Sequence, residues 1–216
     1  MMPMEHVDPR YRIPLPMPDP QLSEFNHHLA GVMVILVGIS AILIYARPRQ
    51  FGFLKYVWPM SLFLLGAYLV VYSDPPGWPT SYVSIAHTWD MPEARQHKIF
   101  ALLLLMMGSV EAARAAGIAK GRMWGLAFPA LALAGAVYLL FHKHGGSGAM
   151  HMEHGEHMEH GSPIVFYQHF TYFLLGLGIV GSRILLEMDK LRTRWGPYIW
   201  PSLTVLLGIA LVFYRE

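Results

Sequence analysis

The sequence predicts an all-α membrane protein, a bundle of six transmembrane helices with both termini on the extracytoplasmic side. Three observations lead to this prediction. The 216-residue chain is 54% apolar and only 14% charged, whereas soluble domains average about 25% charged residues. Its apolar residues form six long runs, and its basic residues gather in every second connection between those runs.

Each apolar run is about long enough to cross a hydrocarbon core of about 30 Å as a helix. The six runs cover residues 29–46, 57–72, 99–118, 123–141, 164–181 and 196–214. Because the runs are continuous rather than alternating, they do not fit the strands of a membrane barrel. The third run carries a charge, Glu111, near its end, and it is counted because the chain must return for the fourth run to span.

The remaining segments divide the chain into a tail and a transmembrane domain. Residues 1–24 contain six prolines and predict an extended, Pro-rich extracytoplasmic tail. This tail lacks the basic start and apolar core of a cleavable signal. Residues 25–216 are predicted to form the six-helix domain, with a His- and Met-rich extracytoplasmic loop at 142–163.

The distribution of Lys and Arg sets the orientation of the predicted helices. The connections after the first, third and fifth runs hold ten of the sixteen basic residues: Arg47, Arg49, Lys55, Arg114, Lys120, Arg122, Arg183, Lys190, Arg192 and Arg194. The positive-inside rule assigns these connections to the cytoplasm. Both termini are therefore expected outside.

With this topology, all twelve histidines lie on the outer side of the membrane. The rule that set the topology counts only Lys and Arg, so the result is independent of it. A simple preference of histidine for membrane interfaces would place histidines on both sides. The asymmetry therefore indicates an outer binding site.

The loop between the fourth and fifth runs carries the densest cluster of metal-binding side chains. Residues 142–160 read HKHGGSGAMHMEHGEHMEH, in which HMEHGE is followed by HMEHGS. Imidazole binds copper, zinc or nickel, and thioether selects Cu(I). Such a tract indicates metal capture, although a solvated low-complexity loop is the alternative. The candidate ligands are His142, His144, His151, Met152, His154, His157, Met158 and His160.

A second constellation is predicted at the outer ends of several helices. Its members are His28, Glu93, His97, His142 and His169. Ionisable groups within membrane helices usually face the bundle interior or an aqueous cavity, so these imidazoles are expected to share one outer pocket. That pocket could hold copper or zinc, or a haem b through two axial histidines. A structural role at the interface remains the alternative for each residue.

Other charges near the inner surface have a simpler interpretation. Glu111 is predicted to pair with Arg114 or with a nearby basic residue. Glu187 and Arg183 are four residues apart on one helical face and predict a second ion pair. The methionines in the middle of the third run are interpreted as core packing.

Composition and motifs exclude several classes of protein. The absence of Cys excludes disulfide scaffolds, thiolate zinc sites and cysteine nucleophiles. A net charge of +2 argues against a nucleic-acid partner. The sequence has no phosphate-binding loop, no HExxH and no Ser/His/Asp set, so an ATP-driven pump and an enzyme are not expected.

Several short motifs in order resemble the copper-resistance protein D family. They are FNHHLAG at 25–31, SDPPGWP at 73–79, QHKIFALLLLMMG at 96–108, FPALALAGAVYLLFHKH at 128–144 and QHFTYFLLGLGIVGSRILLE at 168–187. The resemblance covers most of residues 25–187. It implies a bacterial inner-membrane protein of copper uptake or tolerance. It also implies functional roles for His28, His97, His142, His144 and His169.

Three functions remain open from the sequence. The first is copper binding, transfer or transport by outward-facing His and Met sites, with an extracytoplasmic copper carrier as partner. The second is haem-based electron transfer through paired histidines. The third is a structural accessory subunit of a larger membrane complex.

Overall fold

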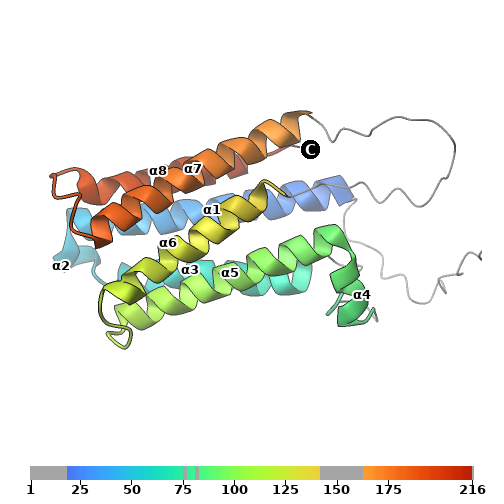
Figure 1. Ribbon diagram of the computed structural model, residues 1–216, viewed down its shortest axis with the longest axis horizontal. Coiled ribbons are helices and arrows are strands. Elements are labelled where there is room, and N and C mark those ends of the chain that lie inside the picture. Colours follow the sequence, from blue (N-terminus) through green and yellow to red (C-terminus); the bar gives the residue numbers. More distant parts are fainter. Residues whose placement is uncertain (1–18, 75–76, 81–82, 142–162, 216) are drawn as a thin grey trace, which may run out of the picture.

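The computed structural model describes residues 19–74, 77–80, 83–141 and 163–215. Every regular element in these residues is helical (Figure 1). The elements are α1 (Asp19–Ala46), α2 (Pro48–Phe51), α3 (Leu54–Tyr72), α4 (Ile85–Asp90), α5 (Pro92–Ala115), α6 (Arg122–Leu139), α7 (Pro163–Glu187) and α8 (Gly196–Val212).

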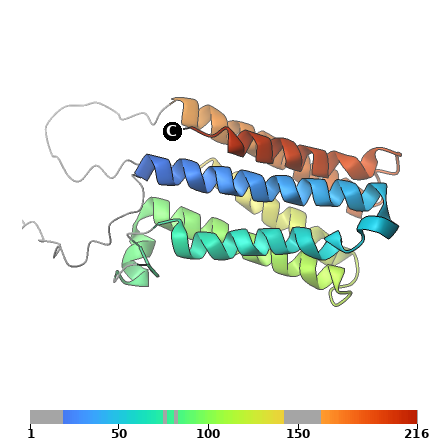
Figure 2. The ribbon, with the colours of Figure 1, turned by 180° about the vertical axis from the view of Figure 1, so that it is seen from behind.

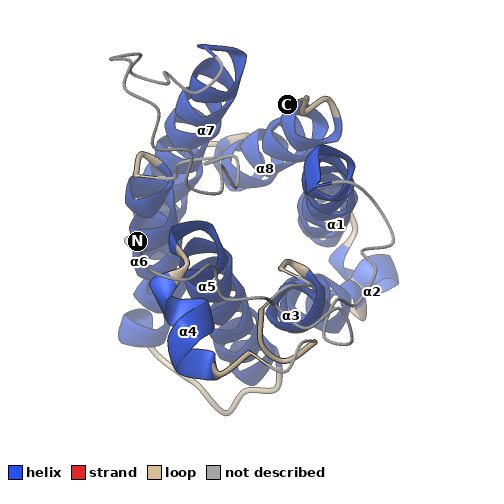
Figure 3. Ribbon diagram, turned by 90° about the vertical axis from the view of Figure 1, so that its right-hand side faces the viewer, coloured by secondary structure: helices blue, strands red, loops and turns tan. Residues whose placement is uncertain are grey.

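Six of these helices form a closed ring. Neighbours around the ring are α1, α3, α5, α6, α7, α8 and again α1 (Figure 3). Successive ring helices run in opposite directions (Figures 1 and 2). The ring therefore consists of three helical hairpins, α1–α3, α5–α6 and α7–α8. We call the end that holds His27, His97 and His169 the histidine end, and the end that holds Arg114 and Arg183 the arginine end.

Each predicted apolar run lies wholly or mostly in one ring helix, which confirms the all-helical class. The runs 99–118, 123–141 and 196–214 extend two or three residues beyond α5, α6 and α8. Four helices are long and apolar enough to cross a membrane: α1, α3, α6 and α7. The apolar helix α8 has 17 residues. Helix α5 is long but carries Lys98 near one end and Glu111 and Arg114 near the other.

Several helix boundaries differ from those of the apolar runs, and two of the differences have a clear physical reason. Helix α1 begins at Asp19, within the segment 1–24 that was expected to be an extended tail. Pro20 occupies the second helical position, where its fixed φ favours a helix and its missing N–H costs nothing. Helix α7 continues to Glu187, beyond the predicted run, because its last turns bury an ion pair described below.

The hairpins approach one another through glycine. A Cβ on Gly31 of α1 would lie 2.6 Å from the carbonyl oxygen of Gly208 in α8, and a Cβ on Gly208 would lie 2.7 Å from the carbonyl oxygen of Gly31. Such close backbone approach is typical of membrane helices, which associate through small residues. Only glycine fits at these two positions.

The outer face of the ring is apolar. Each ring helix exposes a leucine along its length, with exposed fractions between 39% and 55%: Leu36, Leu64, Leu102, Leu133, Leu174 and Leu206. A continuous apolar exterior of this kind marks contact with an apolar phase. It is compatible with a multi-pass membrane protein.

Candidate functional site

A cavity of about 290 Å³ lies at the centre of the ring, and we call it the central chamber. All six ring helices contribute to its wall. One apolar residue from each is Val34, Leu65, Leu103, Ala132, Gly176 and Leu207. The chamber is therefore built by the ring as a whole rather than by one pair of helices.

Three histidines line the histidine end of the chamber. They are His27 on α1, His97 on α5 and His169 on α7. The rings of His27 and His169 meet edge to face, with centroids 6.1 Å apart. The predicted residues His97 and His169 thus share one cavity, and His27 joins them in place of the predicted His28.

His28 is directed elsewhere. Its Nε2 donates to the carbonyl oxygen of Tyr214 at 3.1 Å, just beyond the end of α8, and its side chain is not part of the chamber wall. Consecutive helical residues point about 100° apart. His28 is therefore turned away from the direction of His27, toward the end of α8.

Each of the three chamber histidines is oriented by a hydrogen bond from its Nδ1. Nδ1 of His27 lies 2.8 Å from the carbonyl oxygen of Ser23, and Nδ1 of His169 lies 2.8 Å from that of Val165. Nδ1 of His97 lies 2.9 Å from Asp74 Oδ1. Because carbonyl and carboxylate oxygens accept, each of these Nδ1 atoms carries a proton. Metal-binding histidines are commonly oriented in this way.

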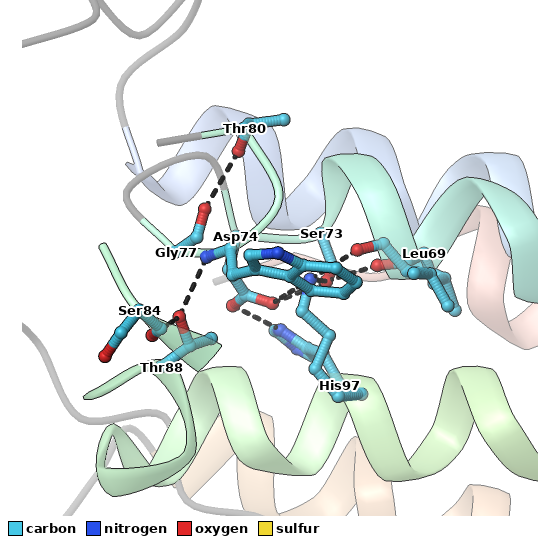
Figure 4. A network of polar contacts seen from close by, with 11 residues as sticks. Leu69, Ser73, Asp74, Gly77, Thr80, Ser84, Thr88 and His97 are labelled. Atoms are coloured by element: carbon cyan, nitrogen blue, oxygen red, sulfur yellow. Dashed lines mark hydrogen bonds and ion pairs between the residues drawn. The ribbon is translucent and has the colours of Figure 1, made fainter. Parts of the chain in front are cut away.

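Asp74 anchors the histidine end electrostatically (Figure 4). Its carboxylate contacts His97, lies 3.7 Å from the ammonium of Lys98 and accepts from the hydroxyl of Ser73. Burial favours the neutral acid and would raise the pKa of Asp74. The hydrogen bond and positive charge of His97, with smaller effects from Ser73 and Lys98, outweigh burial and hold this pKa below its usual value.

The segment after α3 is folded back over Asp74 by its own hydrogen bonds. The amide of Gly77 donates to the carbonyl oxygen of Asp74 at 2.9 Å, and the amide of Trp78 donates to Thr88 Oγ1 at 2.8 Å. The hydroxyl of Thr88 in turn donates to the carbonyl oxygen of Ser84, the residue that caps α4. Helix α4 and Asp74 therefore form one polar network (Figure 4).

The chamber histidines are related by an internal repeat. Each follows an amide residue, in the pairs Asn26–His27, Gln96–His97 and Gln168–His169. In each hairpin, the same interval of 31 residues leads from this histidine to an aromatic residue that precedes a proline: Trp58, Phe128 and Trp200. The ring is thus a threefold repetition of one helical hairpin.

The three amides perform equivalent structural roles. Oδ1 of Asn26 accepts from the hydroxyl of Tyr68 at 2.9 Å, and Nε2 of Gln96 donates to the carbonyl oxygen of Phe141 at 2.7 Å. Gln168, in the amide orientation that satisfies both donor and acceptor, bonds the backbone of Arg215. Each amide therefore ties the first helix of its hairpin to the far part of the second.

The repeated aromatic residues pack against one another between two cavities: Phe128 belongs to the chamber wall, and Trp58 and Trp200 line a second cavity. The ring centroids of Trp58, Phe128 and Trp200 are 5.8 to 6.1 Å apart, so the three side chains make a nearly equilateral aromatic triangle. Prolines 59, 129 and 201 follow them and are fully buried. The triangle separates the chamber from this second cavity of about 320 Å³ at the arginine end.

The second cavity is charged where the chamber is apolar. Arg114 donates to Glu111 at 2.8 Å and to Glu187 at 2.9 Å, and Arg183 lies 2.9 Å from Glu187. The guanidinium of Arg183 also lies over the ring of Trp200 at 4.9 Å. The predicted ion pairs of Glu111 with Arg114 and of Glu187 with Arg183 are confirmed.

Of the other candidate ligands, Glu93 lies within the described residues and does not belong to the chamber wall. Glu93 lies one turn before His97 on α5 and is half-buried. The candidates His142, His144, His151, Met152, His154, His157, Met158 and His160 lie outside the described residues. Within the described part of the chain, no group of three or more His, Asp or Glu side chains is arranged to hold a metal ion.

Sequence reasoning missed His27, Asp74 and the aromatic triangle. Asp74 lies in SDPPGWP, directly after the second apolar run, and an acidic residue on the side of the histidines could have been recognised. The repeated amide–His pairs with their constant interval were also visible. Comparisons with protein-family models, with curated proteins and with solved structures found no match to this chain.

Proposed function

We propose that this chain is a copper-handling integral membrane protein that binds the ion on the extracytoplasmic side and transfers it to a carrier or a larger complex. The observation that carries the proposal is the chamber's histidine end. Three imidazoles, those of His27, His97 and His169, line one cavity, and each donates through Nδ1 to an oxygen that orients its ring. Imidazole nitrogen is a preferred copper ligand.

The His- and Met-rich connection supports the proposal through its position. It is flanked at the histidine end by Phe141, two residues after the end of α6, and by Pro163, the first residue of α7. Thioether and imidazole together favour Cu(I). An ion captured by residues 142–162 is therefore delivered near the chamber rather than at the opposite end of the ring.

Six membrane spans and extracytoplasmic termini complete the proposal. Every ring helix presents an exposed leucine on the outer face, including α5 and α8. The excess of Lys and Arg in the connections of the arginine end favours a cytoplasmic location for that end. The histidine end then faces the extracytoplasmic space of a bacterial inner membrane.

Binding and transfer fit the chamber better than conduction through it. A cation that passed beyond the histidines would enter an apolar space, where an unpaired charge is costly. It would then meet the aromatic triangle and, behind it, the guanidinium of Arg183. Copper is accordingly proposed to enter and leave at the histidine end.

The test uses adjacent histidines as matched variants. Cu(I) affinity of the purified full-length chain is measured by competition with a chromogenic chelator, in a background where the four loop histidines 151, 154, 157 and 160 are replaced by Ala. His27→Ala, His97→Ala and His169→Ala are each expected to weaken binding at least tenfold. His28→Ala, the control, is expected to leave it within about twofold, because its imidazole bonds Tyr214.

Three outcomes would contradict the proposal. Equal losses for His27→Ala and His28→Ala would show that the chamber does not define the site. Tight binding of zinc but not of Cu(I) would reassign the metal. A Soret band in the purified protein that disappears in His97→Ala or His169→Ala would favour the haem-binding alternative.

A further inference from the structure

We infer that the central chamber is a binding site for a small, neutral ring compound with a hydrogen-bonding oxygen, the chemistry of a quinone or phenol head group, taken up from the bilayer. This inference goes beyond copper handling and does not depend on it. It concerns the apolar part of the chamber, between the three histidines and the aromatic triangle.

The first argument is the size and chemistry of the space. A chamber of 290 Å³ is about twice the volume of an apolar protein cavity of about 150 Å³ that stays dry and takes up benzene. It also approaches the lower bound of about 300 Å³ for small-molecule pockets. Aliphatic side chains dominate its wall. A space of this kind favours an apolar occupant over water.

The second argument is that small residues keep the space open. Ala30, Ala132, Gly135 and Gly176 all belong to the chamber wall. A Cβ on Gly135 would make only ordinary contacts, the nearest at 3.6 Å from a side-chain carbon of Leu103. Larger side chains would fit there and fill the chamber. Protein interiors are otherwise close-packed, so the wall is shaped to hold something.

The third argument is the polarity of the two ends. Asn26, Ser73 and the chamber histidines give one end donors and acceptors, whereas Phe128 of the aromatic triangle closes the other. A flat ring can stack on aromatic side chains at favourable offsets. Its oxygen then faces the imidazoles. A charged ligand is excluded because its charge would be buried among aliphatic groups.

The aromatic triangle supplies a direct readout. Trp58 and Trp200 pack against Phe128, which is the chamber residue of the triangle, and both are nearly fully buried. The other four tryptophans are at least 40% exposed: Trp78, Trp89, Trp124 and Trp195. A background in which these four are replaced by Phe leaves fluorescence only from Trp58 and Trp200, which contact the chamber residue Phe128. A quinone in the chamber is expected to quench that fluorescence.

The experiment titrates 2,3-dimethoxy-5-methyl-1,4-benzoquinone into the full-length chain in detergent micelles. Saturable quenching is expected in the four-Phe background. Ala132→Phe, which fills the chamber, is expected to raise the apparent dissociation constant at least tenfold. Leu133→Phe is the matched control, because Leu133 is the next residue and faces outward with 39% of its surface exposed. It is expected to change the constant less than twofold.

Quenching that rises without saturation, or equally in both variants, would overturn the inference. A haem or an acyl lipid recovered in stoichiometric amount from the purified chain and displaced by Ala132→Phe would also overturn it. Val34→Phe fills the chamber from α1, so a folding failure of Ala132→Phe leaves a second variant to decide. Because no copper enters the titration, its result is separate from the copper test.

Discussion

The internal repeat is preserved at the histidine end of the ring and lost at the arginine end. At the histidine end, all three hairpins keep an amide followed by histidine. Fourteen residues further along the same helices, the equivalent positions hold Ala41, Glu111 and Arg183. The first pattern repeats one chemical group around a shared space. The second differentiates the hairpins, so that opposite charges meet and leave no surplus within the group of Glu111, Arg114, Arg183 and Glu187.

This difference separates binding from assembly. Identical imidazoles facing a common chamber are suited to a ligand at the ring centre. The charged residues at the arginine end are not repeated from hairpin to hairpin. They are suited to determining the order of the helices in the ring, because another order would leave buried charges unpaired. The arginine end is therefore expected to dominate stability, and the histidine end to dominate ligand affinity.

The largest expected effect comes from breaking the buried network. Arg183 is 6% exposed and contacts Glu111 and Glu187. Arg183→Leu is expected to lower the free energy of unfolding by about 3–5 kcal/mol, because it leaves buried carboxylates with too little positive charge. Chemical unfolding in mixed micelles, followed by circular dichroism, measures this loss.

The control for this variant is Arg122→Ala. Arg122 and Asp189 form an exposed ion pair at 3.7 Å, and such pairs contribute about 0–1 kcal/mol. Comparable losses in the two variants would show that the arginine end is not the assembly determinant that the comparison assigns to it.

The histidine end is expected to give a smaller, pH-dependent effect through Asp74. Asp74→Ala removes the contacts to His97 and Ser73 and is expected to cost about 1.5–3 kcal/mol, the usual range for hydrogen bonds to a charged group. Because the folded-state pKa of Asp74 is lowered, its ionised form stabilises the fold above the unfolded pKa of about 3.9. That contribution is lost as pH falls through the folded-state value.

Urea unfolding at several pH values checks both parts of this prediction. The difference between the wild type and Asp74→Ala is expected to be largest between about pH 4 and the ordinary histidine pKa of 6.5. It shrinks below about pH 4 as the carboxylate is protonated, and it shrinks at higher pH as His97, whose pKa Asp74 raises, loses its proton. Asp90→Ala is the control, because Asp90 is exposed on α4 in the same part of the molecule. A difference that persists unchanged to pH 2 would contradict the role assigned to the Asp74 carboxylate.

What could be predicted from sequence depended on how local each feature is. The ring helices follow from long apolar runs, and the pairs Glu111–Arg114 and Arg183–Glu187 follow from helical spacing. Contacts between residues far apart in the sequence do not follow from local spacing. The meeting of Asp74 with His97 depends on where α3 ends beside the start of α5.

The hydropathy pattern could not show whether His27 or His28 faces the chamber. Helix α1 is apolar on the face toward its neighbours and on the face that exposes Leu36. Its pattern therefore does not indicate which side turns toward the ring centre. The interval shared by the three hairpins does indicate it, because it aligns His27 with His97 and His169. The internal repeat therefore indicates how α1 is rotated about its axis, which the hydropathy pattern does not.

The smallest expected effect tests whether the repeated amides hold the hairpins together. Tyr68→Phe removes the hydroxyl that donates to Asn26 at 2.9 Å. It is expected to lower the free energy of unfolding by about 1 kcal/mol, the usual net value of one hydrogen bond. Tyr72→Phe is the matched control, since Tyr72 lies one turn further along α3 and is 54% exposed. It is expected to change stability by less than about 0.5 kcal/mol. Tyr68→Phe could instead leave stability unchanged and weaken Cu(I) binding. The amide of Asn26 would then position His27 rather than hold the hairpin together. In that case the histidine end would serve ligand binding alone, and stability would depend on the arginine end.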